Sequence, residues 1–145
     1  MIKINNKKLV VNMNHQNGFN LIELMIVLVI VGIISSIAVP SYQNSVVRSN
    51  RGEGMTAMLD IMRAQEDYFA NNYEYSTTLT DLNYSATVTT ESGAYKITAE
   101  KCGTDALTEC VNLVGTAQGS QTSDGNLELN SRGIRKRGTS TSWAK

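Results

Sequence analysis

The sequence is poor in the side chains that most enzymes use for chemistry. It has one histidine, His15, two cysteines and a single proline among 145 residues. No Ser-His-Asp set, zinc-ligand spacing, C-x-x-C pair or phosphate-binding glycine loop occurs in it. Asp124 and Glu128 are too few carboxylates to form a metal site. These absences argue against a catalytic function, and we expect neither a cofactor nor a bound metal.

An excess of positive charge is also missing. Thirteen basic and thirteen acidic side chains give a formal net charge of zero. Three of the bases, Lys3, Lys7 and Lys8, precede residue 19, so the rest of the chain carries ten bases against thirteen acids. The resulting charge near −3 argues against a general nucleic-acid binder, although it leaves room for a local basic patch.

Residues 19–39 have almost no polar side chains. They read FNLIELMIVLVIVGIISSIAV, and Glu23 is their one charged residue. As a helix these 21 residues are long enough to cross the roughly 30 Å hydrocarbon layer of a membrane. A secretory signal peptide has its cleavage site after the apolar run. Residues 35–38 (SSIA) make a poor site of that kind, which stays an alternative, whereas cleavage at Gly18 would keep the apolar helix in the mature protein.

The charges around the apolar run predict its orientation. Basic residues precede it and are scarce just after it, which favours a cytoplasmic amino end and a carboxyl end outside. Cys102 and Cys110 then lie on the oxidising side. An even cysteine count there predicts a structural disulfide between them, closing a loop of seven residues (GTDALTE).

A family resemblance is carried by the residues around Gly18. The sequence Gly18-Phe19-Asn20-Leu21-Ile22-Glu23-Leu24-Met25 closely resembles the prepilin motif of type IV pilins and type II secretion pseudopilins, which usually has Thr in place of Asn20. Pro40, where the apolar run ends, also matches a common pilin position. The likeness is strong over residues 18–42 and covers the remainder only in layout. It implies an α+β pilin fold, with one long amino-terminal helix packed on a small antiparallel sheet.

The resemblance also implies how the amino end is processed. Prepilin peptidase would cut after Gly18, because its site admits no side chain there, and Phe19 would become the N-methylated amino terminus. The 18-residue leader is longer than the usual type IVa leader. Translation from Met13 would give the six-residue leader MNHQNG and the same mature protein, and this alternative stays open.

Glu23 needs a physical reason to lie in an apolar helix, since a carboxylate costs about 2.5 kcal/mol or more at the bilayer centre. One interpretation is that Glu23 reaches water or headgroups at the cytoplasmic face. The other, which the resemblance favours, is that it pairs with the new amine of Phe19 on an adjacent subunit. Such a pair would neutralise two groups that are each costly alone and would set the register of assembly.

The helical pattern continues past Pro40, so we predict one helix from Phe19 to about Ala70. Polar residues, Asn50 and Arg51 among them, fill the opposite positions, so we expect one face of the helix to pack on a sheet and the other to meet solvent or neighbours. Apolar residues recur mostly at spacings of three or four, at Val46, Val47, Met55, Met58, Leu59, Met62, Phe69 and Tyr73.

Several residues weaken this predicted helix. Gly32 and Pro40 bound a stretch that the resemblance implies will unwind in an assembled filament. Gly52 and Gly54 each cost about 1 kcal/mol relative to Ala. A bend or a close neighbour contact would explain them, but simple tolerance is the favoured interpretation.

The pattern changes after Asn72. Residues 84–90 and 94–100 alternate around a turn at residues 91–93, which predicts a hairpin. Residues 111–118 and 126–130 are further strand candidates, separated by a loop rich in Ser, Thr and Gly at 119–125. We therefore divide the chain into a leader (1–18), a membrane or filament-core helix (19–39), an amphipathic helix half (40–73) and a sheet region (74–145).

One basic cluster, Arg132, Arg135, Lys136 and Arg137, lies near the carboxyl end. On a strand, Arg135 and Arg137 would share a face, and such a patch could hold DNA phosphates. A solvated charged turn is the plainer interpretation.

The resemblance implies a structural subunit of a type IV pilus, serving twitching motility, adhesion or DNA uptake. The modest size and short cysteine loop resemble minor pilins more than major ones. Its partners would be other pilin subunits, prepilin peptidase, the inner-membrane assembly platform, the membrane and, at the basic cluster, DNA. Before assembly it would lie in the inner membrane with its sheet region in the periplasm, and afterwards in the extracellular pilus. A type II secretion pseudopilin and a DNA- or surface-binding tip pilin are the alternatives.

Overall fold

The computed structural model describes residues 19–143, which fall into two compact units that divide at Pro40. We call residues 19–39 the apolar segment and residues 40–143 the globular unit. Helix α1, Leu21–Asn72, forms the apolar segment and continues into the globular unit. This confirms the predicted long helix. Gly18 and the rest of the predicted leader lie outside the described residues.

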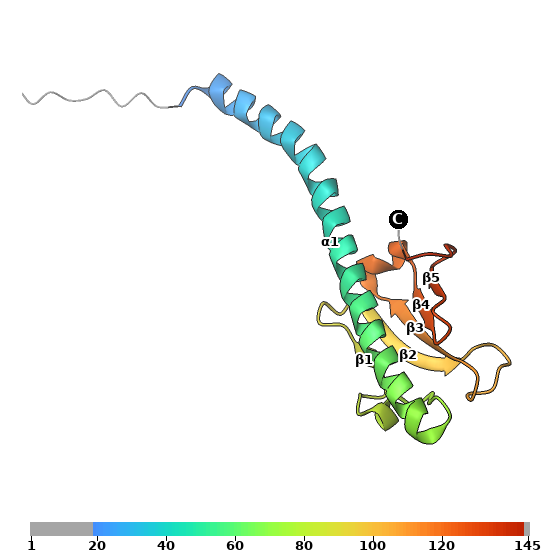
Figure 1. Ribbon diagram of the computed structural model, residues 1–145. Coiled ribbons are helices and arrows are strands. Elements are labelled where there is room, and N and C mark those ends of the chain that lie inside the picture. Colours follow the sequence, from blue (N-terminus) through green and yellow to red (C-terminus); the bar gives the residue numbers. More distant parts are fainter. Residues whose placement is uncertain (1–18, 144–145) are drawn as a thin grey trace, which may run out of the picture. The chain divides into compact units, whose positions relative to one another are not determined.

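Within the globular unit, α1 packs one face against the sheet (Figure 1). Its buried residues follow the helical period: Gly54, Met58, Ile61, Met62 and Gln65. The helix ends at Asn72, where Tyr73 takes a left-handed backbone conformation with φ of 60°. The chain is helical through Pro40. The predicted unwinding concerns an assembled filament and stays a prediction.

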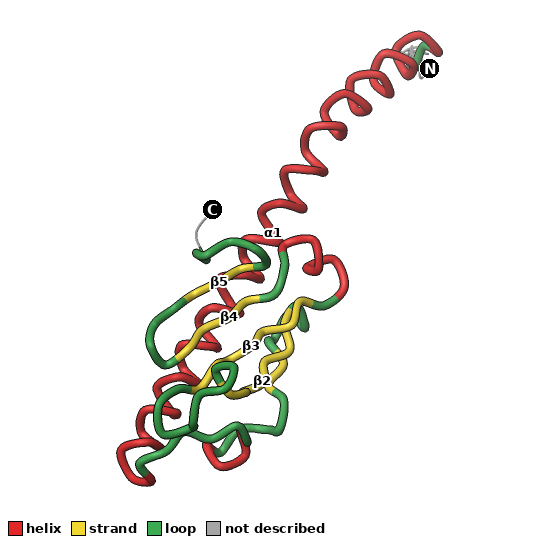
Figure 2. The backbone as a smooth tube through the Cα atoms, turned by 90° about the vertical axis from the view of Figure 1, so that its right-hand side faces the viewer, coloured by secondary structure: helices red, strands yellow, loops and turns green. Residues whose placement is uncertain are grey.

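Five antiparallel strands form the sheet in the order β1-β2-β3-β4-β5. Figure 2 shows β2 to β5 side by side. The core lies between α1 and the sheet, and Tyr95, Ile97, Leu113 and Leu127 are fully buried in it. Helix and sheet together confirm the α+β pilin fold. The strands are β1 Val88–Thr89, β2 Tyr95–Lys101, β3 Val111–Ala117, β4 Leu127–Asn130 and β5 Arg135–Arg137.

The predicted hairpin is right in its pairing and wrong in its first strand. Val88 pairs with Ile97 across β1 and β2, and the turn closes where Gly93 N donates to Thr90 O at 2.8 Å. Residues 84–87 form no strand. The reason is that Tyr84 N donates to Leu79 O at 3.1 Å and closes the short helix η1, Leu79–Leu82, instead of pairing in the sheet.

Two further elements were not predicted. The loop between β3 and β4 contains the 3-10 helix η2, Gly119–Asp124, whose Gln121 is fully buried. Strand β5 lies at the edge of the sheet, beside β4. These two elements position the polar side chains described below.

Gly54 permits the closest approach of α1 to the sheet. A Cβ added there would lie 2.9 Å from Tyr95 Cδ2 and 3.1 Å from Leu127 Cδ1. A Cβ added to Gly52 would meet nothing within 4 Å. The expectation of simple tolerance therefore fits Gly52 and is wrong for Gly54, where the sheet leaves no room for a side chain.

The predicted disulfide is confirmed: Cys102 and Cys110 are bonded, with their Cα atoms 5.6 Å apart. The bridge joins the end of β2 to the start of β3. The enclosed loop is also held from outside, because Tyr75 N donates to Leu107 O at 3.0 Å.

Candidate functional site

The first candidate site is the surface of the apolar segment. All of its large apolar side chains are exposed, from Val27 at 49% to Phe19 at 80%. Among residues 19–143, α1 is the one helix long and apolar enough to cross a membrane. An apolar surface of this size requires a cover, which lipid or other chains can supply.

Glu23 lies in the first turn of α1 and is exposed. The backbone oxygen of Asn20 accepts hydrogen bonds from Glu23 N at 3.0 Å and Leu24 N at 3.2 Å. A negative charge in the first turn is favourable to the helix dipole. Glu23 makes no ion pair with any of the residues that the structure describes. The predicted partner, an amine on another subunit, is untested by this single chain.

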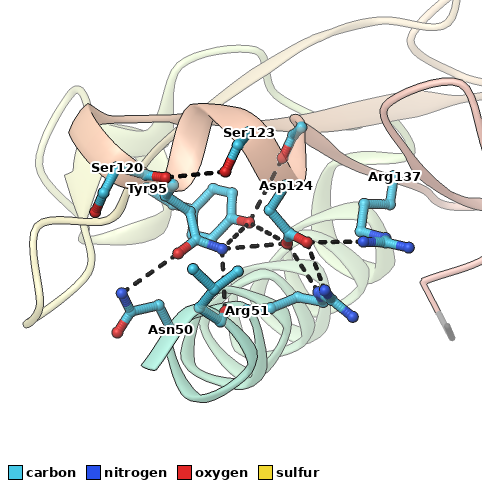
Figure 3. Close-up of polar contacts among 10 residues, drawn as sticks. Asn50, Arg51, Tyr95, Ser120, Ser123, Asp124 and Arg137 are labelled. Carbon is cyan, nitrogen blue, oxygen red and sulfur yellow. Dashed lines mark hydrogen bonds and ion pairs between the residues drawn. The ribbon is translucent and has the colours of Figure 1, made fainter. Parts of the chain in front are cut away.

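The second candidate site is a buried ionic junction at the end of η2 (Figure 3). Asp124 binds two guanidinium groups, one from α1 and one from β5. Arg51 Nε donates to Asp124 Oδ2 at 2.8 Å, its Nη2 donates to Oδ1, and Arg137 Nη1 donates to Oδ1 at 2.7 Å. The Asp124 side chain is 4% exposed, against 11% for Arg51 and 16% for Arg137. The junction thus carries one net positive charge.

Uncharged side chains complete the junction. Tyr95 Oη donates to Asp124 Oδ2 at 3.2 Å, and Gln121 Nε2 lies 3.1 Å from the same oxygen. Gln121 Nε2 also lies 3.0 Å from Tyr95 Oη and 3.1 Å from the backbone oxygen of Val47. Asn50 Nδ2 donates to Gln121 Oε1 at 3.3 Å. These hydrogen bonds connect η2 to the part of α1 that precedes its first core residue, Met58.

The junction fixes the ionisation of its members. Burial acts to raise the pKa of Asp124, but the hydrogen bonds from Arg51 and Arg137 outweigh it and hold that pKa below its ordinary value. The hydrogen bond to Asp124 raises the pKa of Arg51. Burial raises the pKa of Tyr95 to about 12. At neutral pH Asp124 and Arg51 are therefore charged, and Tyr95 is a neutral donor.

The four residues of the predicted basic cluster have different environments. Arg132 pairs with Asp105 at 2.8 Å, and Lys136 pairs with Glu128 at 3.6 Å. Arg135 lies over the ring of Trp143, 5.1 Å from its centroid. The register of the sheet also separates these residues. Arg135 and Arg137 lie opposite the buried Leu129 and Leu127 of β4, so both arginines face the α1 side of the sheet. Lys136, one residue apart, faces the opposite side.

Sequence reasoning missed the junction and assigned two of its members wrongly. Asn50 and Arg51 were expected on the face that meets solvent or neighbours, but both contact η2 of the same chain. Helical periodicity separates apolar from polar side chains and cannot show that a polar one is buried with a partner. The available signal was Asp124, the one acid in the loop at 119–125.

Comparison with known families separates the chain into the same two parts. Residues 13–39 match the family described as "Prokaryotic N-terminal methylation motif". Residues 40–128 match the family described as "Type IV minor pilin ComP, DNA uptake sequence receptor". Strand β5 and Trp143 lie beyond the residues matched.

Individual relatives are pilus proteins. The chain is 33% identical over 109 residues to the fimbrial protein EcpC of Eikenella corrodens, covering 73% of this chain and 69% of that protein. It is 35% identical over 68 residues to the type IV major pilin protein PilA of Myxococcus xanthus, covering 47% and 31%. It is 40% identical over 60 residues to a fimbrial protein of Neisseria meningitidis, covering 41% and 35%. The latter two alignments span about a third of each relative's length.

Proposed function

Because the chain belongs to the type IV pilin family, we propose that it is a minor pilin that gives a type IV pilus the capacity to capture DNA. The match of residues 40–128 to a family described as a minor pilin and DNA uptake sequence receptor carries this proposal. A structural rather than catalytic role fits the family. The negative net charge after residue 18 requires that DNA meet a local basic surface and not the protein as a whole.

Assembly depends on the apolar segment. In this proposal, prepilin peptidase cuts between Gly18 and Phe19, Phe19 is N-methylated, and the inner-membrane platform passes the subunit from the membrane into the filament. The globular unit faces the periplasm before assembly. The exposed apolar side chains supply non-specific contact, and Glu23 sets the register by pairing with the amine of a neighbouring Phe19. The stretch between Gly32 and Pro40 unwinds in the filament.

Deleting the gene in its natural host tests the proposal. Pili, twitching, transformation and protein secretion are scored in the same strain. We expect pili to remain and transformation to be lost, because a minor pilin with a receptor role adds a function without building most of the filament. Loss of nearly all pili would identify a major pilin. Loss of secretion with normal transformation would identify a type II secretion pseudopilin.

Complementing the deletion tests the role of Glu23. The Glu23→Val variant should be cleaved and inserted normally but be depleted from sheared filaments, because it lacks the acid that pairs with a neighbour's amine. The Ile26→Val variant changes the same segment without altering charge and should be present at the wild-type level. Normal abundance of Glu23→Val in filaments would show that the register mechanism is wrong.

A further inference from the structure

Two hollows lie along α1, one against η2 and the other against the carboxyl-terminal segment. The first, about 340 Å³, is lined by Arg48, Arg51, Ser123 and Asp124 among others. The second, about 520 Å³, is lined by Met55, Leu59, Arg135 and Trp143 among others. They succeed one another along the helix, since Arg51 lines the first and Gly52 the second. We call the two hollows together the α1 groove.

The α1 groove is strongly biased towards positive charge. Arg48, Arg51 and Arg135 line it, and Asp124 is its one lining carboxylate. That carboxylate is already bound by Arg51 and Arg137. Arg48 is exposed and makes no ion pair within residues 19–143. Arg135 is exposed too, and its cationic contact is with the Trp143 ring. The groove therefore has cations to offer an anionic ligand, and its single carboxylate is buried.

The two hollows differ in chemistry in a way that suits a nucleotide chain. The first has the amide of Asn44 beside its arginines, and an amide group can donate hydrogen bonds to phosphate oxygens. The second has apolar side chains, Met55 and Leu59, beside Arg135. A sugar or base face can lie against such a surface while the phosphates meet the arginines.

We propose that the α1 groove binds the phosphodiester backbone of DNA, with Arg48 and Arg135 contacting phosphates at its two ends. This inference rests on the proposed function, because the choice of DNA over another polyanion comes from it. It reduces the set of residues in the basic cluster that are expected to contact DNA. Arg135 lines the groove, while Arg132 and Lys136 do not. It also adds Arg48, which lies 87 residues away from Arg135 along the chain.

Arg51 and Arg137 have a supporting part. Asp124 holds both guanidinium groups in place and joins α1 to β5, the two walls that carry Arg48 and Arg135. The stacking of Arg135 on Trp143 limits the freedom of its side chain, and Trp143 itself is fixed because its Nε1 donates to Glu128 O at 3.0 Å. The cations are thus positioned before a ligand arrives.

The experiment compares two pairs of substitutions that remove the same charge. The full chain is purified in a neutral detergent, and its binding to a fluorescent 30-base-pair DNA duplex is followed by fluorescence anisotropy at several salt concentrations. The groove pair is Arg48→Gln with Arg135→Gln. The control pair is Arg132→Gln with Lys136→Gln, both surface residues that already have acidic partners. Circular dichroism records the folding of each variant.

The expected result is a large effect of the groove pair alone. Loss of two phosphate contacts should lower the slope of log K against log salt by about two and weaken binding at low salt by about tenfold or more. The control pair should bind within about twofold of wild type, because its cations make no phosphate contact in this proposal. Should the double groove variant unfold, Arg48→Glu alone replaces it, since that side chain is exposed and has no ion pair among the described residues.

The outcomes separate the groove from the proposed function. If the wild-type protein binds DNA and the control pair weakens binding as much as the groove pair does, the α1 groove is not the DNA site. The proposal of DNA capture would still stand. Absence of wild-type binding even at low salt would overturn both. Tighter binding of polyglutamate than of the duplex, at equal charge concentration, would also overturn the groove as a DNA site, because it would indicate an acidic protein segment as the ligand.

Discussion

The contact between Gly54 and the sheet leads to a prediction in which two neighbouring glycines respond differently to the same substitution. Gly52 and Gly54 lie two residues apart in α1, so replacing either one by alanine brings the same gain in helix propensity, about 1 kcal/mol. The surroundings of the two new methyl groups differ. At Gly52 nothing lies within 4 Å of the added Cβ, and at Gly54 it would meet Tyr95 and Leu127.

The magnitude follows from those contacts. A Cβ at 2.9 Å from Tyr95 Cδ2 and 3.1 Å from Leu127 Cδ1 is far inside normal carbon separations, and both side chains are fully buried. Such overpacking costs about 1–3 kcal/mol. Gly54→Ala should therefore be neutral to about 2 kcal/mol destabilising, while Gly52→Ala should be stabilising by about 1 kcal/mol. The difference between the two variants isolates the steric cost.

Urea unfolding of a soluble fragment, residues 43–145, measures this difference. The fragment keeps the whole buried core, whose residues lie between Met58 and Trp143. The two midpoints in a parallel thermal scan should differ by roughly 4–8 °C for each kcal/mol. Equal stabilisation by both substitutions would refute the reasoning, because it would mean that the sheet yields to a methyl group at Gly54 without cost.

Two further predictions concern the other constraints on the globular unit. Because the pKa of Asp124 is lower in the folded protein than in the unfolded chain, its stabilising effect is present above the unfolded value, about 3.9, and is lost as the pH falls through the folded value. The Asp124→Asn variant should have a free energy of unfolding about 3 kcal/mol below that of wild type at pH 7. Between pH 5 and pH 2 this free energy should change less in the variant than in wild type. Equal acid sensitivity of the two proteins would contradict the lowered pKa of Asp124. Reducing the bond between Cys102 and Cys110 should cost about 2.5 kcal/mol in the same urea assay, and the double Cys→Ser variant should then be insensitive to reductant; a midpoint unchanged by reduction would show that the loop is held by its other contacts.

The sequence predicted those features that rest on repetition or on local chemistry. The apolar spacing from Val46 to Tyr73 located α1 to within two residues of its end, and the alternation at 94–100 located β2. The cysteine pair identified the disulfide. These patterns are visible in the sequence itself, so they can be recognised without knowledge of the tertiary structure.

Features that depend on contacts between distant residues were not predicted. Strand β5 is Arg135–Arg137, three cations with no apolar alternation, and it exists because β4 offers it a partner. Arg51 is buried because Asp124 lies 73 residues further along the chain. The close approach at Gly54 depends on Tyr95. The α1 groove has the same origin, since its walls come from both ends of the globular unit.

The shape of the sheet has a consequence for self-association. A sheet edge with unpaired backbone groups can recruit a strand from another molecule, and natural proteins avoid this with short or charged edge strands. Here one edge strand, β1, has only two residues, and the other, β5, consists of two arginines and a lysine. Both edges therefore disfavour the addition of strands from a second copy. In the proposed filament, ordered growth would then depend on the exposed helix.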